Sequence, residues 1–202
     1  MIVLFTVWGY AVTAIECAAL LTGLASVGLG IVGSRWTWPP GFLSSLLYCW
    51  LFVELHLFAS AALQVVFMAT SIWGWISWGK EGALVPRRLT LAGRLCVSAG
   101  VVVLSVLAAP ALRSIGGSAV WGDAFVLVGS LTAQVLMVLQ KIETWPWWSV
   151  VSIAGALLYA SQGLYFTSLF YAVLSLLAVT GWRAWSARSA DHSMTPPAAA
   201  IS

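Results

Sequence analysis

The chain has 202 residues, of which 61% are hydrophobic and 7% are charged, and its formal net charge at pH 7 is +3. Soluble domains carry about 25% charged residues, so this composition excludes an ordinary soluble protein and indicates an integral membrane protein. The nine Lys and Arg residues are spread along the chain without forming a basic patch, which argues against nucleic acid as a partner.

The predicted elements are seven membrane-spanning helices, and the fold class is therefore all-α. Apolar stretches of about 20 residues recur, the length that a helix needs to cross the hydrocarbon core. Strand-length alternation that would indicate an outer-membrane barrel is absent. The N-terminal stretch lacks a positive region and a cleavage signal, so we expect it to be retained. In chain order, the expected spans are 1–33, 38–56, 57–78, 89–109, 120–140, 145–163 and 164–185.

Two further segments are expected outside the membrane. Pro110, Arg113 and the glycines at 116 and 117 predict a loop after the fourth span. The polar, proline-containing residues 187–202 are expected to form a disordered cytoplasmic tail.

Several landmarks recur at one separation of 107 residues, with no gap. A shared offset predicts a duplication, with 1–79 and 117–186 as three-helix repeats and 80–116 as a loop and linker helix. Because the linker is a single span, the repeats are expected to be parallel, as in the sugar carriers called SWEETs. The related pairs are Glu16 and Asp123, Trp38-Pro39 and Trp145-Pro146, Leu57-Phe58 and Leu164-Tyr165, and Gly74–Trp78 and Gly181–Trp185.

The basic residues predict the orientation. With the N-terminus outside, eight of the nine fall at the inner ends of spans and only Arg113 falls outside. This positive-inside bias predicts an external N-terminus and a cytoplasmic C-terminus.

Polar and aromatic residues form stripes on three predicted helices, which indicates a substrate path between the repeats. The third-span stripe has spacings of 4, 7 and 4 residues, and it ends in a tryptophan. The candidates are Ser60, Gln64, Ser71 and Trp75 in span three, Trp148, Ser152 and Tyr159 in span six, and Thr167 and Tyr171 in span seven.

Each candidate has an alternative explanation. Hydroxyls in membrane helices often bond a carbonyl of their own helix or pack at helix contacts. An unpaired amide in lipid is costly, so Gln64 requires a site or a tight interhelical contact, and we favour the site. Trp75 and Trp148 fit either a site or an interfacial aromatic belt, whereas Trp147 is assigned to the belt.

The remaining ionisable residues are also ambiguous. Glu16 and Asp123 fit a proton relay or a structural hydrogen bond in each repeat. Lys141 and Glu143 are expected to be solvated or paired.

No enzyme, metal or cofactor signature is legible. The three cysteines lie in apolar segments and are expected to be small core residues. There is no Walker motif and no catalytic triad, so neither an enzyme nor an ATP-driven pump is indicated.

Five motifs together resemble the PnuC family of vitamin-precursor transporters, over nearly the whole chain up to Trp185. They are W-x-W-P-P-G at 36–41, A-A-L-Q-V-V-F at 61–67, G-W-x-x-W at 74–78, K-I-E-x-W-x-W-W at 141–148 and G-L-Y-x-T-S-L-F-Y at 163–171. The resemblance implies a homotrimer in the bacterial inner membrane. It also implies facilitated diffusion of nicotinamide riboside, which a cytosolic kinase then traps, while relatives carry thiamine or riboflavin.

The resemblance also implies site residues. The glutamine of the A-L-Q element is Gln64, and the site tryptophan after K-I-E-x-W is Trp148. Ser152 stands where the family usually has Asn or Asp, and Ser60 stands where many members have Asp. These two departures leave the vitamin open.

We therefore expect a uniporter for nicotinamide riboside, with thiamine and riboflavin as alternatives. A membrane subunit that binds the vitamin without transporting it is the alternative from a different class.

Overall fold

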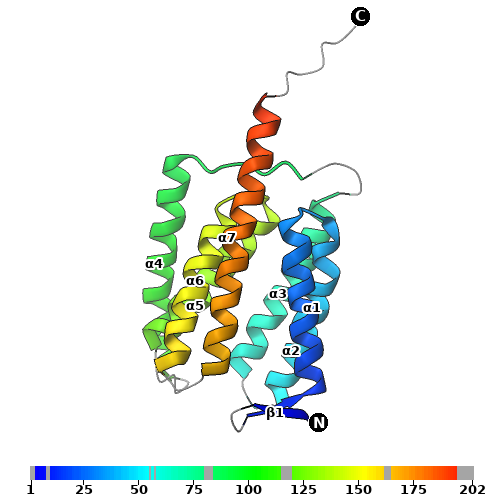
Figure 1. Ribbon diagram of the computed structural model, residues 1–202. Helices are drawn as coiled ribbons and strands as arrows, with labels where there is room; N and C mark the ends of the chain where they lie inside the picture. The colour runs from blue at the N-terminus through cyan, green and yellow to red at the C-terminus, as the bar shows by residue number, and fades with distance from the viewer. Residues whose placement is uncertain are drawn as a thin grey trace, which may run out of the picture. The chain divides into compact units, whose positions relative to one another are not determined.

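The computed structural model describes residues 3–7, 10–54, 56, 58–79, 84–114, 120–161 and 165–194, and seven α-helices lie within them, as predicted (Figure 1). The chain divides into two compact units, Met1–Gly82 and Ala83–Ser202. Four of the described helices have the length and hydropathy to cross a membrane. These apolar segments are Ala14–Ile31, Ser60–Ser77, Leu91–Ser114 and Val120–Val138.

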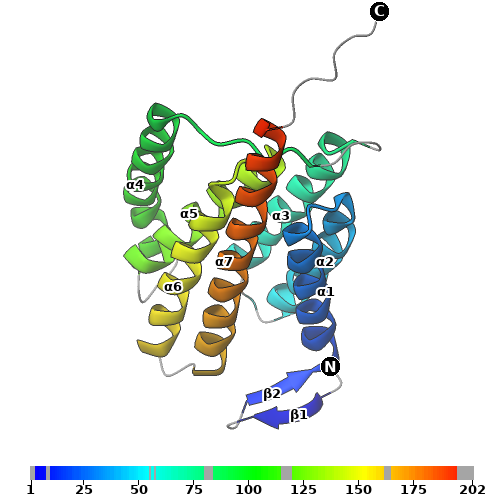
Figure 2. The same ribbon diagram turned by 45° about the horizontal axis from the view of Figure 1, so that its top comes forward.

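The first unit begins with a β-hairpin rather than with a helix. Strands β1 (Val3–Val7) and β2 (Tyr10–Thr13) pair antiparallel and lead into α1 (Ala14–Ile31; Figure 2). The prediction that the first span starts at the N-terminus was therefore wrong. Thr13 has an extended backbone, and its hydroxyl accepts a hydrogen bond from the Glu16 amide at 3.2 Å, which caps the helix at this point.

The rest of the first unit is helical. A 3₁₀ turn, η1 (Arg35–Thr37), precedes α2 (Trp38–Glu54), and α3 (Phe58–Ser77) follows. Prolines 39 and 40 lie in the first turn of α2, where the amide that proline lacks has no partner within the helix. Helix α2 packs against both α1 and α3.

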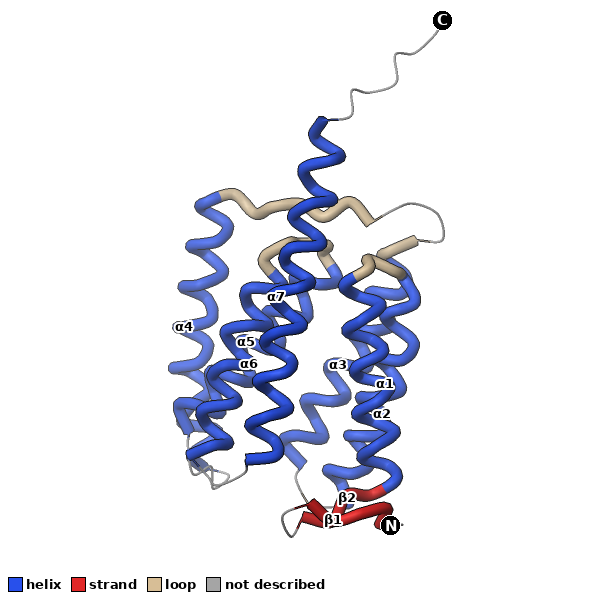
Figure 3. Tube along the Cα trace, viewed as in Figure 1, coloured by secondary structure: helices blue, strands red, loops and turns tan. Residues whose placement is uncertain are grey.

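The second unit contains α4 (Leu91–Ser114), α5 (Val120–Val138), α6 (Thr144–Ser161) and α7 (Tyr165–Met194). Each helix packs against the next one along the chain. The segment before α4, drawn as a loop in Figure 3, is tied to the α5–α6 turn. The Arg87 amide donates to the Gln140 carbonyl at 3.0 Å, and the Ile142 amide donates to the Arg87 carbonyl at 3.1 Å.

Two helix ends differ from the predictions. Helix α4 continues through Pro110 to Ser114, where a loop was expected, because a proline in the last turns removes only one hydrogen bond. Helix α7 runs to Met194, beyond the expected start of the tail at 187 (Figure 1). Residues 186–194 contain neither Gly nor Pro, so nothing in them stops the helix. The expected disorder of 195–202 lies outside the described residues.

The separation of 107 residues also relates contacts inside the two units. In the first unit, the Trp38 ring packs on Gly74 and meets the Trp78 ring edge to face, with centroids 5.1 Å apart. The equivalent contact in the second unit, with centroids 5.5 Å apart, is made by Trp145, Gly181 and Trp185. The Nε1 atoms of Trp38 and Trp145 are both buried without a hydrogen-bond partner in the described part of the chain.

A buried threonine repeats in the same way. The Thr37 hydroxyl donates to the Ser26 carbonyl at 2.7 Å, and 107 residues later the Thr144 hydroxyl donates to the Ala133 carbonyl at 2.8 Å. Both threonines are at most 3% exposed. The sequence offset therefore corresponds to shared three-dimensional contacts in each unit.

Candidate functional site

The predicted stripe on α3 lies on the less exposed side of that helix. Ala62, Val66 and Trp73, on the opposite side, are exposed, as expected of side chains that face lipid. The stripe residues are buried or half-buried, and they are Ser60, Gln64, Ser71 and Trp75.

Two residues of this stripe have partners within the first unit. The Ser71 hydroxyl donates to the Phe67 carbonyl of its own helix at 2.8 Å, the alternative expected for hydroxyls in membrane helices. The Arg35 guanidinium lies 3.7 Å from the centroid of the Trp75 ring, and its Nε donates to the Trp75 carbonyl at 3.1 Å. One face of Trp75 is therefore covered by a cation, which reduces the aromatic surface available to a ligand.

Gln64 differs from these two residues. It is half-buried, and its side chain makes no hydrogen bond to another described residue. A side-chain amide has two donor and two acceptor positions, so Gln64 keeps its hydrogen-bonding capacity for a group outside its own unit.

In the second unit, α6 and α7 bring three predicted site residues to one face. Trp148 and Ser152 are one turn apart on α6, and Ser152 is 2% exposed. The Tyr171 ring of α7 lies against Gly155, where a Cβ would come within 2.5 Å of the ring. Since Gly155 follows Ser152 by about one turn, Trp148, Ser152 and Tyr171 line the same side of α6.

The two remaining candidates, Tyr159 and Thr167, lie in helices, but their side chains are outside the described part of the structure. The substrate-binding role of all nine candidates stays a prediction.

The acidic residues of the predicted proton relay lie in equivalent places. Glu16 is in the first turn of α1, and Asp123 is in the first turn of α5. The amino end of a helix stabilises a negative charge, which favours the structural alternative for both residues.

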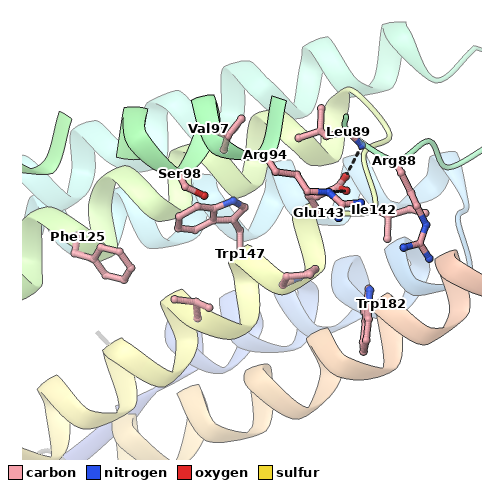
Figure 4. Close-up of a pocket in the computed structure, with 12 residues that line it drawn as sticks. Arg88, Leu89, Arg94, Val97, Ser98, Phe125, Ile142, Glu143, Trp147 and Trp182 are labelled. Atoms are coloured by element: carbon pink, nitrogen blue, oxygen red, sulfur yellow. Dashed lines mark hydrogen bonds and ion pairs between the residues drawn. The ribbon is translucent and has the colours of Figure 1, made fainter. Parts of the chain in front are cut away.

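Glu143 is paired, one of the two alternatives expected from the sequence. Its Oε1 accepts a hydrogen bond from Arg94 Nε at 2.9 Å, and its Oε2 accepts one from the Leu89 amide at 3.1 Å (Figure 4). The Glu143 side chain is 14% exposed and that of Arg94 is 45% exposed. The carboxylate thereby joins the start of α6 to the start of α4.

Beside this ion pair, the second unit contains a cleft of about 620 Å³ (Figure 4). Its walls come from all four helices of the unit, and residues of the predicted substrate site are not among them. Trp147 had been assigned to the aromatic belt, and Trp182 is the repeat equivalent of Trp75. The offset of 107 could have indicated Trp182, whereas no sequence signal pairs Arg94 with Glu143. The polar and aromatic residues of the lining are Arg88, Arg94, Ser98, Phe125, Glu143, Trp147 and Trp182.

Residues 13–187 match the protein family described as nicotinamide mononucleotide transporter. The chain belongs to this family. The match covers all seven helices apart from the last turns of α7, so the PnuC resemblance deduced from the motifs is confirmed.

Individual members of the family are also similar over most of their length. The chain is 31% identical to the riboflavin/roseoflavin transporter RibM of Streptomyces davaonensis over 181 residues, which are 86% of this chain and 84% of RibM. It is 25% identical to the nicotinamide riboside transporter PnuC of Escherichia coli over 207 residues, with 88% and 87% covered. These relatives are membrane transporters rather than enzymes.

The crystal structure of the vitamin B3 transporter PnuC has the same fold. The two structures superpose with a TM-score of 0.73, covering 88% of this chain and 83% of the other, at 24% sequence identity. The chain is thus a multi-pass membrane transporter of the PnuC family.

Proposed function

We propose that this PnuC-family transporter carries riboflavin or a close flavin analogue across the bacterial cytoplasmic membrane by facilitated diffusion. The observation that carries this choice is the identity of 31% to a riboflavin/roseoflavin transporter over 86% of the chain, against 25% to the PnuC of Escherichia coli. This order of substrates differs from the one expected from the motifs, which placed nicotinamide riboside first.

The side chains in the second unit support a flat aromatic substrate. Trp148 and Tyr171 offer ring faces on one side of α6, and aromatic pairs gain about 0.5–1.5 kcal/mol beyond the area that they bury. Ser152 between them is small and buried, and its hydroxyl makes no hydrogen bond to another described residue. A short hydroxyl leaves more room for a tricyclic ring than the Asn or Asp of the PnuC pattern.

Nicotinamide riboside is the second candidate, because the family description and the PnuC relatives favour it. In this case the free amide of Gln64 would bond the carboxamide of the pyridine ring.

For the mechanism, two parallel three-helix repeats joined by α4 move against each other around a substrate between them. The Trp–Gly–Trp contacts at equivalent places support units that move as rigid bodies. Neither an ATPase motif nor a basic partner for the intramembrane acids is legible, so accumulation depends on phosphorylation of the vitamin inside the cell. We further propose an external N-terminus, a cytoplasmic C-terminus and a homotrimer.

The test is counterflow in proteoliposomes that contain this protein alone. Vesicles preloaded with unlabelled riboflavin are expected to take up labelled riboflavin, with weaker exchange of nicotinamide riboside and thiamine. A flavokinase and ATP inside the vesicles are expected to convert exchange into accumulation. Absence of exchange for all three vitamins would leave the non-transporting vitamin-binding subunit as the explanation. Exchange of nicotinamide riboside alone would reverse the order of the two candidates.

A further inference from the structure

The cleft of the second unit opens beside the apolar surface of α4. Helix α4 packs against α5, and the space between α4 and the pair α6 and α7 is the cleft (Figure 4). Leu95, Val102 and Val106 of α4 are each more than half exposed, as expected of side chains in contact with lipid. Lipid chains in the bilayer therefore have lateral access to the cleft.

The walls of the cleft are mainly apolar. Val97 of α4, Phe125 of α5 and Val150 of α6 supply hydrocarbon, and Trp147 extends from α6 toward α4, where Ser98 lies (Figure 4). The volume of about 620 Å³ lies within the range of small-molecule sites, roughly 300–1,000 Å³. A hydrocarbon chain is the group that such walls accommodate without leaving buried polar groups unpaired.

One end of the cleft carries a surplus positive charge. Arg88, Arg94 and Glu143 lie at this end, and Glu143 already neutralises Arg94. Arg88 forms no ion pair with another described residue, so the three groups together have a net charge of +1. Trp147 and Trp182 add indoles at the same end, which is the composition of a membrane–water interface.

We propose that this cleft binds one anionic phospholipid, with its phosphodiester at Arg88 and one acyl chain between α4 and α6. A phosphodiester carries one negative charge, which matches the surplus of the cleft. Basic pockets between membrane helices are sites of this kind for acidic headgroups. The lipid fills the space between α4 and α6 that the Arg94–Glu143 pair bridges at one end. Phosphatidylglycerol is the probe that represents this class.

The transported vitamin is a less suitable occupant of the cleft. Of the described candidates, Gln64, Trp148, Ser152 and Tyr171 are all absent from the lining. Moreover, neither a flavin nor nicotinamide riboside offers a flexible hydrocarbon chain.

The test measures lipid binding directly, so its outcome does not depend on transport. The full chain in detergent is titrated with phosphatidylglycerol or phosphatidylcholine, and bound lipids are counted by native mass spectrometry. Phosphatidylglycerol is expected to bind one per chain. Arg88→Gln should weaken this binding about fivefold, the factor that corresponds to ~1 kcal/mol per basic residue. Arg113→Gln, at the other end of α4, is the control and should leave binding unchanged.

A second variant tests the acyl-chain part without changing charge. Ser98→Phe fills the cleft and should reduce phosphatidylglycerol binding, whereas Val103→Phe, on an exposed side of α4, should not. Equal losses in Arg88→Gln and Arg113→Gln would overturn the proposal in favour of diffuse electrostatic attraction. Displacement by glycerol 3-phosphate would indicate a phosphate site rather than a lipid site, and displacement by riboflavin would assign the cleft to the transport path.

Discussion

Gln64 has the chemistry at the residue scale that packing explains least. Its amide is half-buried in a membrane helix and lacks a hydrogen bond to the described residues, whereas Ser71 on the same stripe is satisfied by its own helix. Trp75, the aromatic end of that stripe, is covered by Arg35. Among the aromatic candidates, Trp148 is therefore the stronger one for stacking on a ring.

Gln64→Ala and Trp148→Ala are each expected to weaken riboflavin binding about fivefold, because one hydrogen bond or one stacking contact contributes ~1 kcal/mol. Quenching of flavin fluorescence on titration with purified protein measures the dissociation constant. Trp73→Ala is the control, since Trp73 lies on the exposed side of α3. Unchanged affinity in both site variants would show that the stripes serve packing only.

At the scale of elements, the Trp–Gly–Trp contacts hold neighbouring helices together in each unit. The glycine is needed because the indole of Trp38 or Trp145 occupies the place of a Cβ at position 74 or 181. Such a close approach lets the last turns of α3 and α7 pack directly against the first turns of α2 and α6.

Gly181→Ala and Gly74→Ala are each expected to destabilise the protein by about 1–3 kcal/mol, the usual cost of overpacking a core. The measurement is the unfolding temperature in detergent. Gly28→Ala is the matched control, because a Cβ there meets nothing within 4 Å and alanine favours a helix over glycine. A control that loses as much stability as Gly181→Ala would contradict this explanation.

The Arg94–Glu143 pair joins two further elements, the beginnings of α4 and α6. Glu143→Gln is expected to lower the free energy of unfolding by ~1 kcal/mol, a modest value because Arg94 is largely exposed and water screens the pair. Thermal unfolding in lipid-free detergent measures the change. Arg88→Gln removes an unpaired cation and should leave the unfolding temperature unchanged. Partial rescue by the double exchange Arg94→Glu with Glu143→Arg would identify the pair itself as the source.

At the scale of the whole molecule, the distribution of charge determines the expected orientation. Arg113 follows α4 at one end, and Arg183 lies near the end of α7 at the side where eight basic residues gather in the predicted topology.

Single cysteines test this orientation. In a variant without the three native cysteines, Arg113→Cys is expected to react with an impermeant maleimide from outside intact cells. Arg183→Cys should react only in inverted vesicles. The opposite labelling pattern would reverse the topology and place the cleft's charged end at the outer face.

The sequence by itself determined the membrane class, the number of helices, most helix ends, the repeat spacing and the family. These properties depend on local apolarity, helical periodicity and short motifs, which are legible along the chain. The α3 stripe was predictable for the same reason, because Ser60, Gln64, Ser71 and Trp75 share a face of any helix that contains them.

Only the tertiary structure decided which partners those residues have. Arg35 and Trp75 are 40 residues apart, and Arg94 and Glu143 are 49 apart. No local pattern encodes such pairs, because they depend on which helices pack and at what depth their ends meet. The hairpin before Ala14 and the cleft beside α4 follow from the same cause. Apolarity specifies that a segment is buried in protein or lipid, and packing decides which of the two surrounds it.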